Sequence, residues 1–244
     1  MHADEKWLKY AREVLQAPPD LLSCCDGGIP SNSSNPAYAA RIRRWPGYIG
    51  KRYAIGRVLL VGAIHNPAKL FQAIGNDLEQ EVRNWLVEEP SARSNGRYLD
   101  AVRRTYTAAY REWAKFTVWR NFERLLGYCK LGFDEVAFTN LAKCYLEPQR
   151  PKGKRVGYTE FVCRCNSHYP INALCGAIKP ALVLIASEAK KITEMTPIKV
   201  ETESSLPLVY RFVNAGPKQG QRNGEPIQQW GPVAVQHYRN ALGR

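Results

Sequence analysis

The sequence predicts an α/β fold in which a mainly parallel, four-stranded central sheet lies between helices, as a three-layer α/β/α sandwich. Two observations predict this fold. Four short runs of apolar residues alternate along the chain with stretches of helical periodicity. The chain also has 244 residues, 45% of them hydrophobic, without an internal repeat or a clear boundary, so we expect one domain with a substantial core. The predicted strands are residues 57–61, 135–138, 181–186 and 208–213.

Helical periodicity accounts for much of the remaining chain. An amphipathic helix is expected over 4–17, and an insert over 76–128 is expected to be helical, with aromatic residues three or four positions apart. This spacing is typical of a stripe that packs into the core, and not of a platform on which bases stack. Residues 1–50 are predicted to be the N-terminal helix followed by a basic loop. Shorter helices are expected over 171–178, 188–193 and 230–242.

The charge of the chain indicates its partner. Lysine and arginine number 35 against 22 aspartate and glutamate residues, which gives a formal net charge of +13. An excess of this size favours binding to nucleic acid, here DNA in single- or double-stranded form. No apolar run approaches the ~20 residues of a membrane span, and the N-terminus carries no apolar signal region. We therefore expect a cytoplasmic monomer that binds DNA and not a membrane.

Asparagines follow three of the four predicted strands. The carboxyl ends of parallel strands meet at one edge of a sheet, where ligands of α/β proteins bind. Three amides at three strand ends can therefore converge on one crevice. The alternative is that each asparagine only caps a turn, which is its commonest use. The three residues are Asn66, Asn140 and Asn214.

The block that contains Asn140 has a distinctive order. An apolar strand runs into Thr139-Asn140, two apolar residues and Lys143-Cys144 follow, and Pro148 and Arg150 lie behind them. A Lys-Pro pair and a further apolar strand come later, at residues 179–186. In this order of motifs the chain resembles the uracil-DNA glycosylase superfamily, and it is most similar to the bacterial iron–sulfur branch of that superfamily. The resemblance runs from about residue 57 to the C-terminus.

This resemblance implies an activity. A DNA glycosylase of this kind is a monofunctional hydrolase that flips uracil or a modified pyrimidine out of DNA, hydrolyses its N-glycosidic bond and leaves an abasic site. It would serve base-excision DNA repair or, if the base is a hypermodified pyrimidine of phage DNA, antiviral defence. The alternative is a catalytically silent nucleic-acid-binding protein on the same scaffold, because Asn214 stands where the family has a histidine.

The resemblance also implies roles for single residues. Alignment of the first loop on Pro67 puts Asn66 at the catalytic position, where its amide holds the attacking water. Asn140 would then read the base edge, since a carboxamide matches N3 and the exocyclic group of a pyrimidine. His65 either donates to the leaving base or is an ordinary loop histidine. The remaining residues of the implied site are Asn214 in the catalytic loop, and Gly62 and Phe71 beside the base.

Basic residues are expected to grip the DNA phosphates. Several of them lie in residues 149–155, which we call the basic loop, and others lie in a short run near residue 43. Taken alone, each such run is more often a solvated loop, but the net charge favours a function. The predicted DNA contacts are Arg43, Arg44, Lys143, Arg150, Lys152, Lys154, Arg155, Lys218 and Gln219.

The chain has seven cysteines, which are potential ligands of a metal ion or an iron–sulfur cluster. The resemblance implies that an iron–sulfur cluster would take Cys144 as a ligand, with Cys163 or Cys165 near the next position. The N-terminal pair is adjacent, Cys24-Cys25, and adjacent thiolates do not easily ligate one iron site. We therefore expect no cofactor and no metal. The alternatives are this cluster and a zinc site made by Cys163, Cys165, His168 and Cys175.

Overall fold

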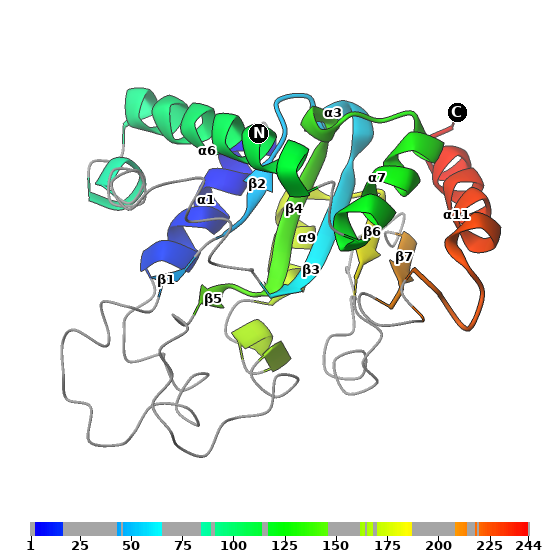
Figure 1. The fold of residues 1–244 in the computed structure, drawn as a ribbon. Coiled ribbons are helices and arrows are strands. Elements are labelled where there is room, and N and C mark those ends of the chain that lie inside the picture. The colour runs from blue at the N-terminus through cyan, green and yellow to red at the C-terminus, as the bar shows by residue number, and fades with distance from the viewer. Residues whose placement is uncertain are drawn as a thin grey trace, which may run out of the picture.

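The computed structural model describes a central sheet and the helices that pack around it (Figure 1). The α/β class predicted from the sequence is confirmed, since parallel strands and helices alternate along the chain. None of the helices in the described ranges combines the length and the apolar character that crossing a membrane requires. The described residues are 3–16, 43–44, 46–64, 84–88, 91–113, 117–145, 162–163, 165–167, 170–186, 208–213, 218 and 220–243.

The described sheet has five strands, in the order β2-β4-β3-β6-β7. Four of them are the predicted strands, and they run parallel to one another. The prediction of a four-stranded sheet was wrong, because β2 adds an antiparallel edge strand beside β4. A separate two-stranded ladder joins β1 to β5. The strands are β1 Arg43–Arg44, β2 Tyr48–Ile49, β3 Val58–Ile64, β4 Val136–Ala142, β5 Cys144–Tyr145, β6 Leu182–Ile185 and β7 Leu208–Arg211.

Strand β2 lies within residues 1–50, in the part after the N-terminal helix that the sequence predicted to be a loop with basic residues. Gly47 leads into it with φ +114°, and a Cβ atom at this position would lie 2.1 Å from the Phe138 carbonyl oxygen. Only glycine therefore allows the chain to approach β4 this closely. The Thr139 hydroxyl donates a hydrogen bond to the Pro46 carbonyl at 2.8 Å and fixes the approach. Residues 1–50 thus contribute a strand to the sheet in addition to their N-terminal helix.

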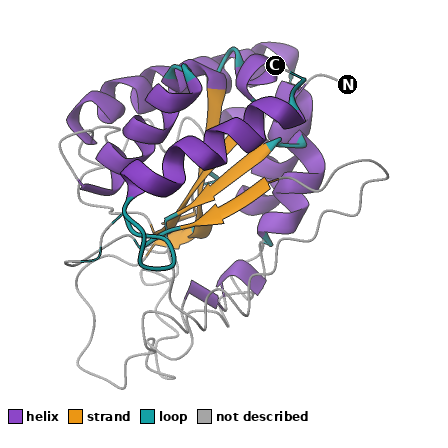
Figure 2. Ribbon diagram, turned by 90° about the vertical axis from the view of Figure 1, so that its right-hand side faces the viewer, coloured by secondary structure: helices purple, strands orange, loops and turns teal. Residues whose placement is uncertain are grey.

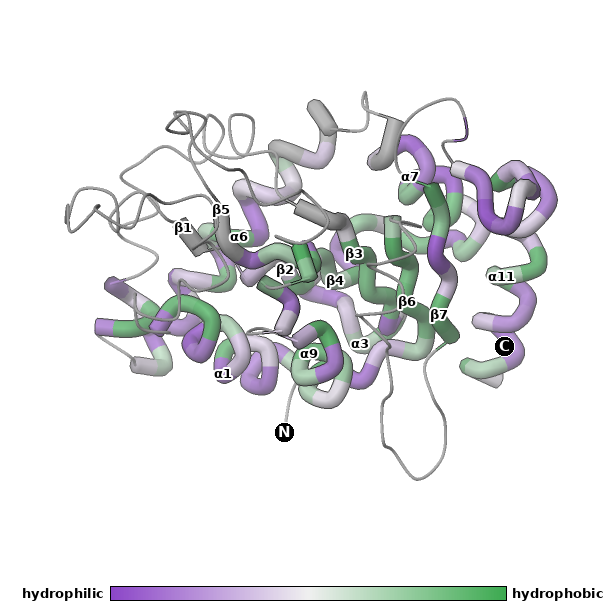
Figure 3. The backbone as a smooth tube through the Cα atoms, turned by 90° about the horizontal axis from the view of Figure 1, so that it is seen from below, coloured by the Kyte–Doolittle hydropathy of each residue, from purple (hydrophilic) through white to green (hydrophobic). Residues whose placement is uncertain are grey.

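Helices cover both faces of the sheet (Figures 2 and 3). Figure 3 shows α6 and α7 on one side of the strands, and α1 and α9 on the other. Helix α11 packs beside α7 and contacts β7. The described helices are α1 Ala3–Gln16, α3 Tyr53–Gly56, the π-helix η2 Asn84–Glu88, α6 Ala92–Trp113, α7 Thr117–Cys129, the 3-10 helix η3 Phe133–Glu135, α9 Ile171–Ile178 and α11 Ile227–Ala241.

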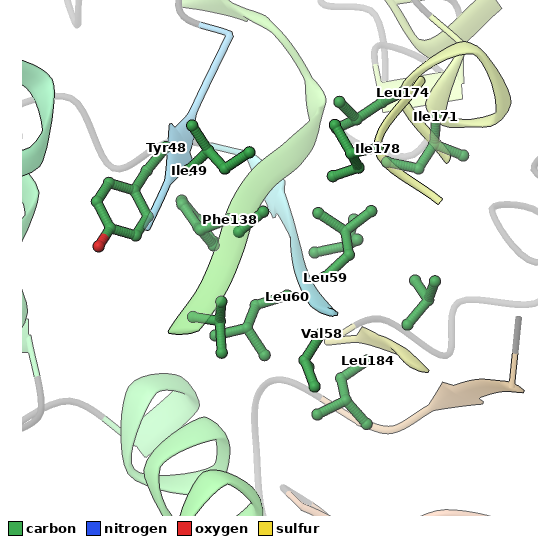
Figure 4. Close-up of a cluster of buried hydrophobic side chains, with 14 of the residues drawn as sticks. Tyr48, Ile49, Val58, Leu59, Leu60, Phe138, Ile171, Leu174, Ile178 and Leu184 are labelled. Atoms are coloured by element: carbon green, nitrogen blue, oxygen red, sulfur yellow. The ribbon is translucent and has the colours of Figure 1, made fainter. Parts of the chain in front are cut away.

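Alternation along the strands sends neighbouring side chains to opposite faces. In Figure 4, Leu59 lies on the side of the α9 residue Ile178, whereas Leu60 points the other way. Phe138, which pairs with Leu60 in the register, meets Trp119 of α7 with ring centroids 4.7 Å apart. Helices cover both faces, and β3 and β6 are accordingly almost continuous hydrophobic runs, as is usual for buried parallel sheets, whereas β4 includes the polar Thr139 and Asn140.

The helix predictions agree with the structure wherever it describes them. The N-terminal and C-terminal helices are present, and the insert over 76–128 contains η2, α6 and most of α7. Its aromatic residues form part of the core: Tyr106 and Phe122 are fully buried, which confirms the interpretation as a core stripe. The helix predicted over 188–193 lies outside the described residues.

Candidate functional site at the carboxyl end of the sheet

The central strands β3 and β4 run side by side toward the same edge, at the lower end of the sheet in Figure 1. Near that edge the register pairs Gly62 of β3 with Asn140 of β4. The structure therefore brings together Gly62 and Asn140, two of the residues that were predicted to contact the pyrimidine base. The strand β4 continues to Ala142, so Asn140 lies inside the strand. The sequence had predicted that the strand ends at residue 138, before Asn140.

Glycine at position 62 leaves space for the Asn140 amide. A Cβ atom built on Gly62 would lie 2.2 Å from Asn140 Oδ1 and 3.7 Å from the Phe138 ring. These distances put the Asn140 side chain on the face of the sheet that α6 and α7 cover. Asn140 is 2% exposed, so its carboxamide is held in one place by its surroundings. The result is a fixed amide at the edge where α/β proteins bind ligands.

Lys143 follows β4 and has an environment that the sequence did not predict. Its side chain is fully buried, and its Nζ donates a hydrogen bond to the main-chain carbonyl of Asn140. Its main-chain N–H donates to Cys165 Sγ at 3.1 Å. The sequence placed Lys143 on the DNA-facing surface, but a buried ammonium does not lie where a phosphate could reach it. Lys143 instead lies buried at the end of β4, where its side chain contacts the main chain of Asn140.

Two thiols, those of Cys165 and Cys175, lie close to this lysine. Cys163, Cys165 and Cys175 are free and buried. Burial raises the pKa of the Cys175 thiol to about 12, and the nearby Lys143 ammonium opposes this rise. Cys175 is therefore a neutral thiol at neutral pH. Within the described ranges, no group of three or more His, Cys, Asp or Glu side chains is arranged to hold a metal ion.

The ladder between β1 and β5 places a basic segment beside this edge. Arg43 pairs with Tyr145, and Arg44 pairs with Cys144, the residue that follows Lys143. The backbone of the two predicted DNA-contacting arginines therefore runs along the chain that leaves β4. Sequence reasoning could not find this neighbourhood, because about a hundred residues separate the two strands.

Charged side chains lie at both ends of β4. Asp134 and Glu135 precede the strand, and Arg52 binds both carboxylates, each with an N–O distance of 2.9 Å. The buried Lys143 follows the strand at its other end.

Helix α7 contributes a polar residue for which the sequence analysis gave no role. Asn121 is 4% exposed, and its Nδ2 has no hydrogen-bond partner in the part of the chain that the structure describes. Its carboxamide lies against Gly220, where a Cβ atom would be 3.1 Å from Nδ2. Lys218, one of the predicted DNA contacts, is exposed in the turn that follows β7.

Several predicted site residues lie outside the described residues. The structure thus gives no geometry for the first catalytic loop, the basic loop or the catalytic part of the last loop. The side chains of Arg43, Arg44 and Cys144 also lie outside what is described. The remaining predicted residues without described geometry are His65, Asn66, Phe71, Arg150, Lys152, Lys154, Arg155, Asn214 and Gln219.

Comparison with known proteins leaves the chain without an assigned family. No family model matches it, and no curated protein matches its sequence. Among the described residues, the carboxyl edge of the sheet gathers the polar groups that bear on function. This edge offers a fixed amide with both donors and acceptors, a neighbouring glycine that makes room for it, and a buried cation beneath it. Such a combination suits the recognition of a flat, polar, electron-rich ligand.

Proposed function

We propose that this protein is a DNA glycosylase that hydrolyses the N-glycosidic bond of an extruded uracil or modified pyrimidine and leaves an abasic site. The observation that carries the proposal is the Asn140 carboxamide, fixed at the carboxyl edge of the parallel sheet opposite Gly62. One acceptor and two donors on a rigid strand complement the N3 position and the exocyclic group of a pyrimidine. Rigid strands also hold such a group more precisely than a loop does.

The chemistry needs little from the protein beyond placement and electrostatics. The bond between the sugar C1′ and the base N1 breaks, and its electron pair leaves with the base. Water adds to C1′, and its proton ends on the base or in solvent. In the proposed roles, Asn66 holds the water by accepting a hydrogen bond from it, and His65 donates to the base oxygen. Preorganised groups of this kind stabilise charge that develops only in the transition state.

The net charge of +13 supports DNA as the substrate. The described edge adds local support, because the β1 backbone with its two arginines and the exposed Lys218 flank the strands. The basic loop follows β5 in the sequence, and in this proposal it grips the phosphates beside the extruded nucleotide. DNA repair and defence against phage with modified DNA both fit this substrate class, and the excised base distinguishes them.

The proposal is tested by incubating the protein with duplexes that contain uracil or a modified pyrimidine, followed by alkali, which cleaves the strand at abasic sites. We expect cleavage with the wild type and none with Asn66→Ala, whereas DNA affinity stays within a few-fold. Binding without cleavage on every substrate would contradict the proposal and favour the silent DNA-binding protein. Full activity of Asn66→Ala would leave a glycosylase but move the water-holding role to another residue.

A further inference from the structure

We infer that Arg222, which follows the last strand of the sheet, binds a DNA phosphate and anchors the duplex a few base pairs from the extruded base. This inference rests on the proposed function, because it takes DNA as the ligand. Arg222 lies on the chain that returns from β7, after the exposed Lys218. The sequence analysis gave this arginine no role, because it stands outside the basic runs of the chain.

Main-chain hydrogen bonds fix the position of Arg222 from both sides. Before it, the Val213 N–H donates to the Gln221 carbonyl at 2.9 Å, which ties the returning chain to the end of β7. After it, Arg222 and Glu225 exchange two hydrogen bonds of 2.9 Å each. Residues 223–224 between them have φ +51° and +85°, the left-handed conformation of a tight hairpin turn. The backbone of Arg222 is therefore held in place before any ligand binds.

The side chain of Arg222 lies over an aromatic ring. Its Cζ is 4.8 Å from the centroid of the Tyr210 ring, which is a cation–π contact. Tyr210 is fixed in turn, because its hydroxyl and His237 Nδ1 form a hydrogen bond of 2.7 Å and its ring stacks on Trp230 with centroids 6.1 Å apart. A guanidinium that rests on a fixed ring loses less conformational freedom when it binds a ligand than a free side chain does.

The guanidinium donors of Arg222 are available to a ligand. Arg52 and Arg103 bind carboxylates, and Arg239 donates to a main-chain carbonyl. Within the described ranges the guanidinium of Arg222 has no partner of either kind, and the exposed carboxylate of Glu225 does not pair with it. Five N–H donors in a planar fork match the oxygen atoms of a phosphate. The charge and the geometry of this side chain thus suit the backbone of DNA.

Arg222 also lies on the face of the sheet that carries Asn140. The register pairs Tyr210, through β6 and β3, with Phe138 of β4, and residues paired in this way point to one face. Phe138 and Asn140 are two positions apart and share that face. Three strand spacings of about 4.8 Å separate β4 from β7, or roughly 14 Å, which equals about four base-pair steps. One duplex can therefore place its extruded base at Asn140 and a phosphate at Arg222.

The experiment measures binding to one fluorescent duplex of unmodified DNA at several salt concentrations, for the wild type and Arg222→Gln. Each phosphate contact contributes about 0.9 to the slope of log K against log salt. We expect Arg222→Gln to lower this slope by about 0.9, which corresponds to about eight-fold weaker binding at ~0.1 M salt when affinities are equal at about 1 M. The matched control is Lys51→Gln, which removes an exposed charge beside Arg52 at the amino edge of the sheet and should keep the wild-type slope.

A double-variant cycle tests Tyr210 as the positioning residue of Arg222. Tyr210→Leu should weaken binding by less than Arg222→Gln does, and the double variant should bind like Arg222→Gln alone, because the ring acts only through the guanidinium. Tyr210→Phe keeps the ring and should bind like the wild type. Losses that add in the double variant would overturn the role of the ring, and if Tyr210→Leu does not fold, the slope of Arg222→Gln decides alone.

The slope and the base-release assay fail separately. An unchanged slope in Arg222→Gln, or an equal fall in Lys51→Gln, overturns the inference, even where the wild type releases a base. A lowered slope in Arg222→Gln without base release from any DNA keeps the phosphate contact and contradicts the glycosylase proposal. A wild type that does not bind DNA overturns both.

Discussion

Replacing Gly62 with alanine should remove base release without unfolding the protein. The new Cβ atom would lie 2.2 Å from Asn140 Oδ1, whereas ordinary contact begins at 3.4 Å. The neighbouring main chain is fixed in the sheet, where Gly62 pairs with Asn140 in the register. The Asn140 carboxamide must therefore move by about 1.2 Å, the difference between these two distances.

The size of this shift determines the expected loss in the rate of base release. A displacement of about 1 Å in a positioning group can cost on the order of 100-fold in rate. We expect single-turnover base release by Gly62→Ala to fall by at least about that factor. DNA affinity should stay within a few-fold, because phosphate contacts dominate it. The steric cost falls on one buried side chain and not on the main chain, so we expect the variant to fold with lowered stability.

Two matched variants control for the added methyl group. Gly127 of α7 and Gly176 of α9 have nothing within 4 Å of a built Cβ atom, so alanine there meets open space. In a helix interior, glycine to alanine stabilises by about 0.5–1 kcal/mol. Gly127→Ala and Gly176→Ala should keep wild-type rates. Near-normal base release by a folded Gly62→Ala would show that the Asn140 amide does not read the base, and the argument from this edge would be refuted.

Three further predictions concern charge and protonation. Asn140→Asp, which replaces donors with a buried carboxylate, should abolish base release by repelling the anionic base while circular dichroism stays native; unchanged rate and base choice would remove Asn140 from the pocket. Neutralising the four basic residues of the basic loop should lower the slope of log K against log salt by about two to three units in binding titrations, and parallel lines would move the DNA surface elsewhere. Burial raises the pKa of the Cys175 and Cys129 thiols to about 12 from 9.0, so the folded state holds these protons more tightly than the unfolded state. Stability is thus complete below about pH 9 and falls as the pH rises toward 12; urea melts with equal midpoints at pH 8 and pH 10.5 would contradict this.

The sequence was sufficient to predict the four parallel strands, but it did not predict the antiparallel edge strand β2. Apolar runs such as that around Leu184 predict buried parallel strands, because both faces of the sheet are covered. Strand β2 escaped detection because Tyr48-Ile49 is too short to show any period, and its place depends on the approach that Gly47 permits. That approach is a tertiary fact about a distant carbonyl, which no local pattern contains.

Part of the geometry of the candidate site could be predicted, for similar reasons. A polar amide beside an apolar strand led to Asn140, and the structure pairs it with Gly62, another predicted residue. The burial of Lys143 could not be foreseen, because a lysine in a basic chain is normally a surface residue. The same holds for Asn121, whose position depends on how α7 meets the turn after β7. Packing between distant segments decides both cases.

The central claim, that the amide edge of the sheet serves base excision, is tested most directly by mass spectrometry of the free base. The wild type and Asn140→Asp are incubated with a panel of DNAs that contain uracil, natural pyrimidines and phage-type modified pyrimidines. We expect the wild type to release one class of pyrimidine as the intact free base, in amounts equal to the abasic sites formed, and Asn140→Asp to release none of it. Absence of any free base with every DNA, or equal release by the two proteins, would contradict the account.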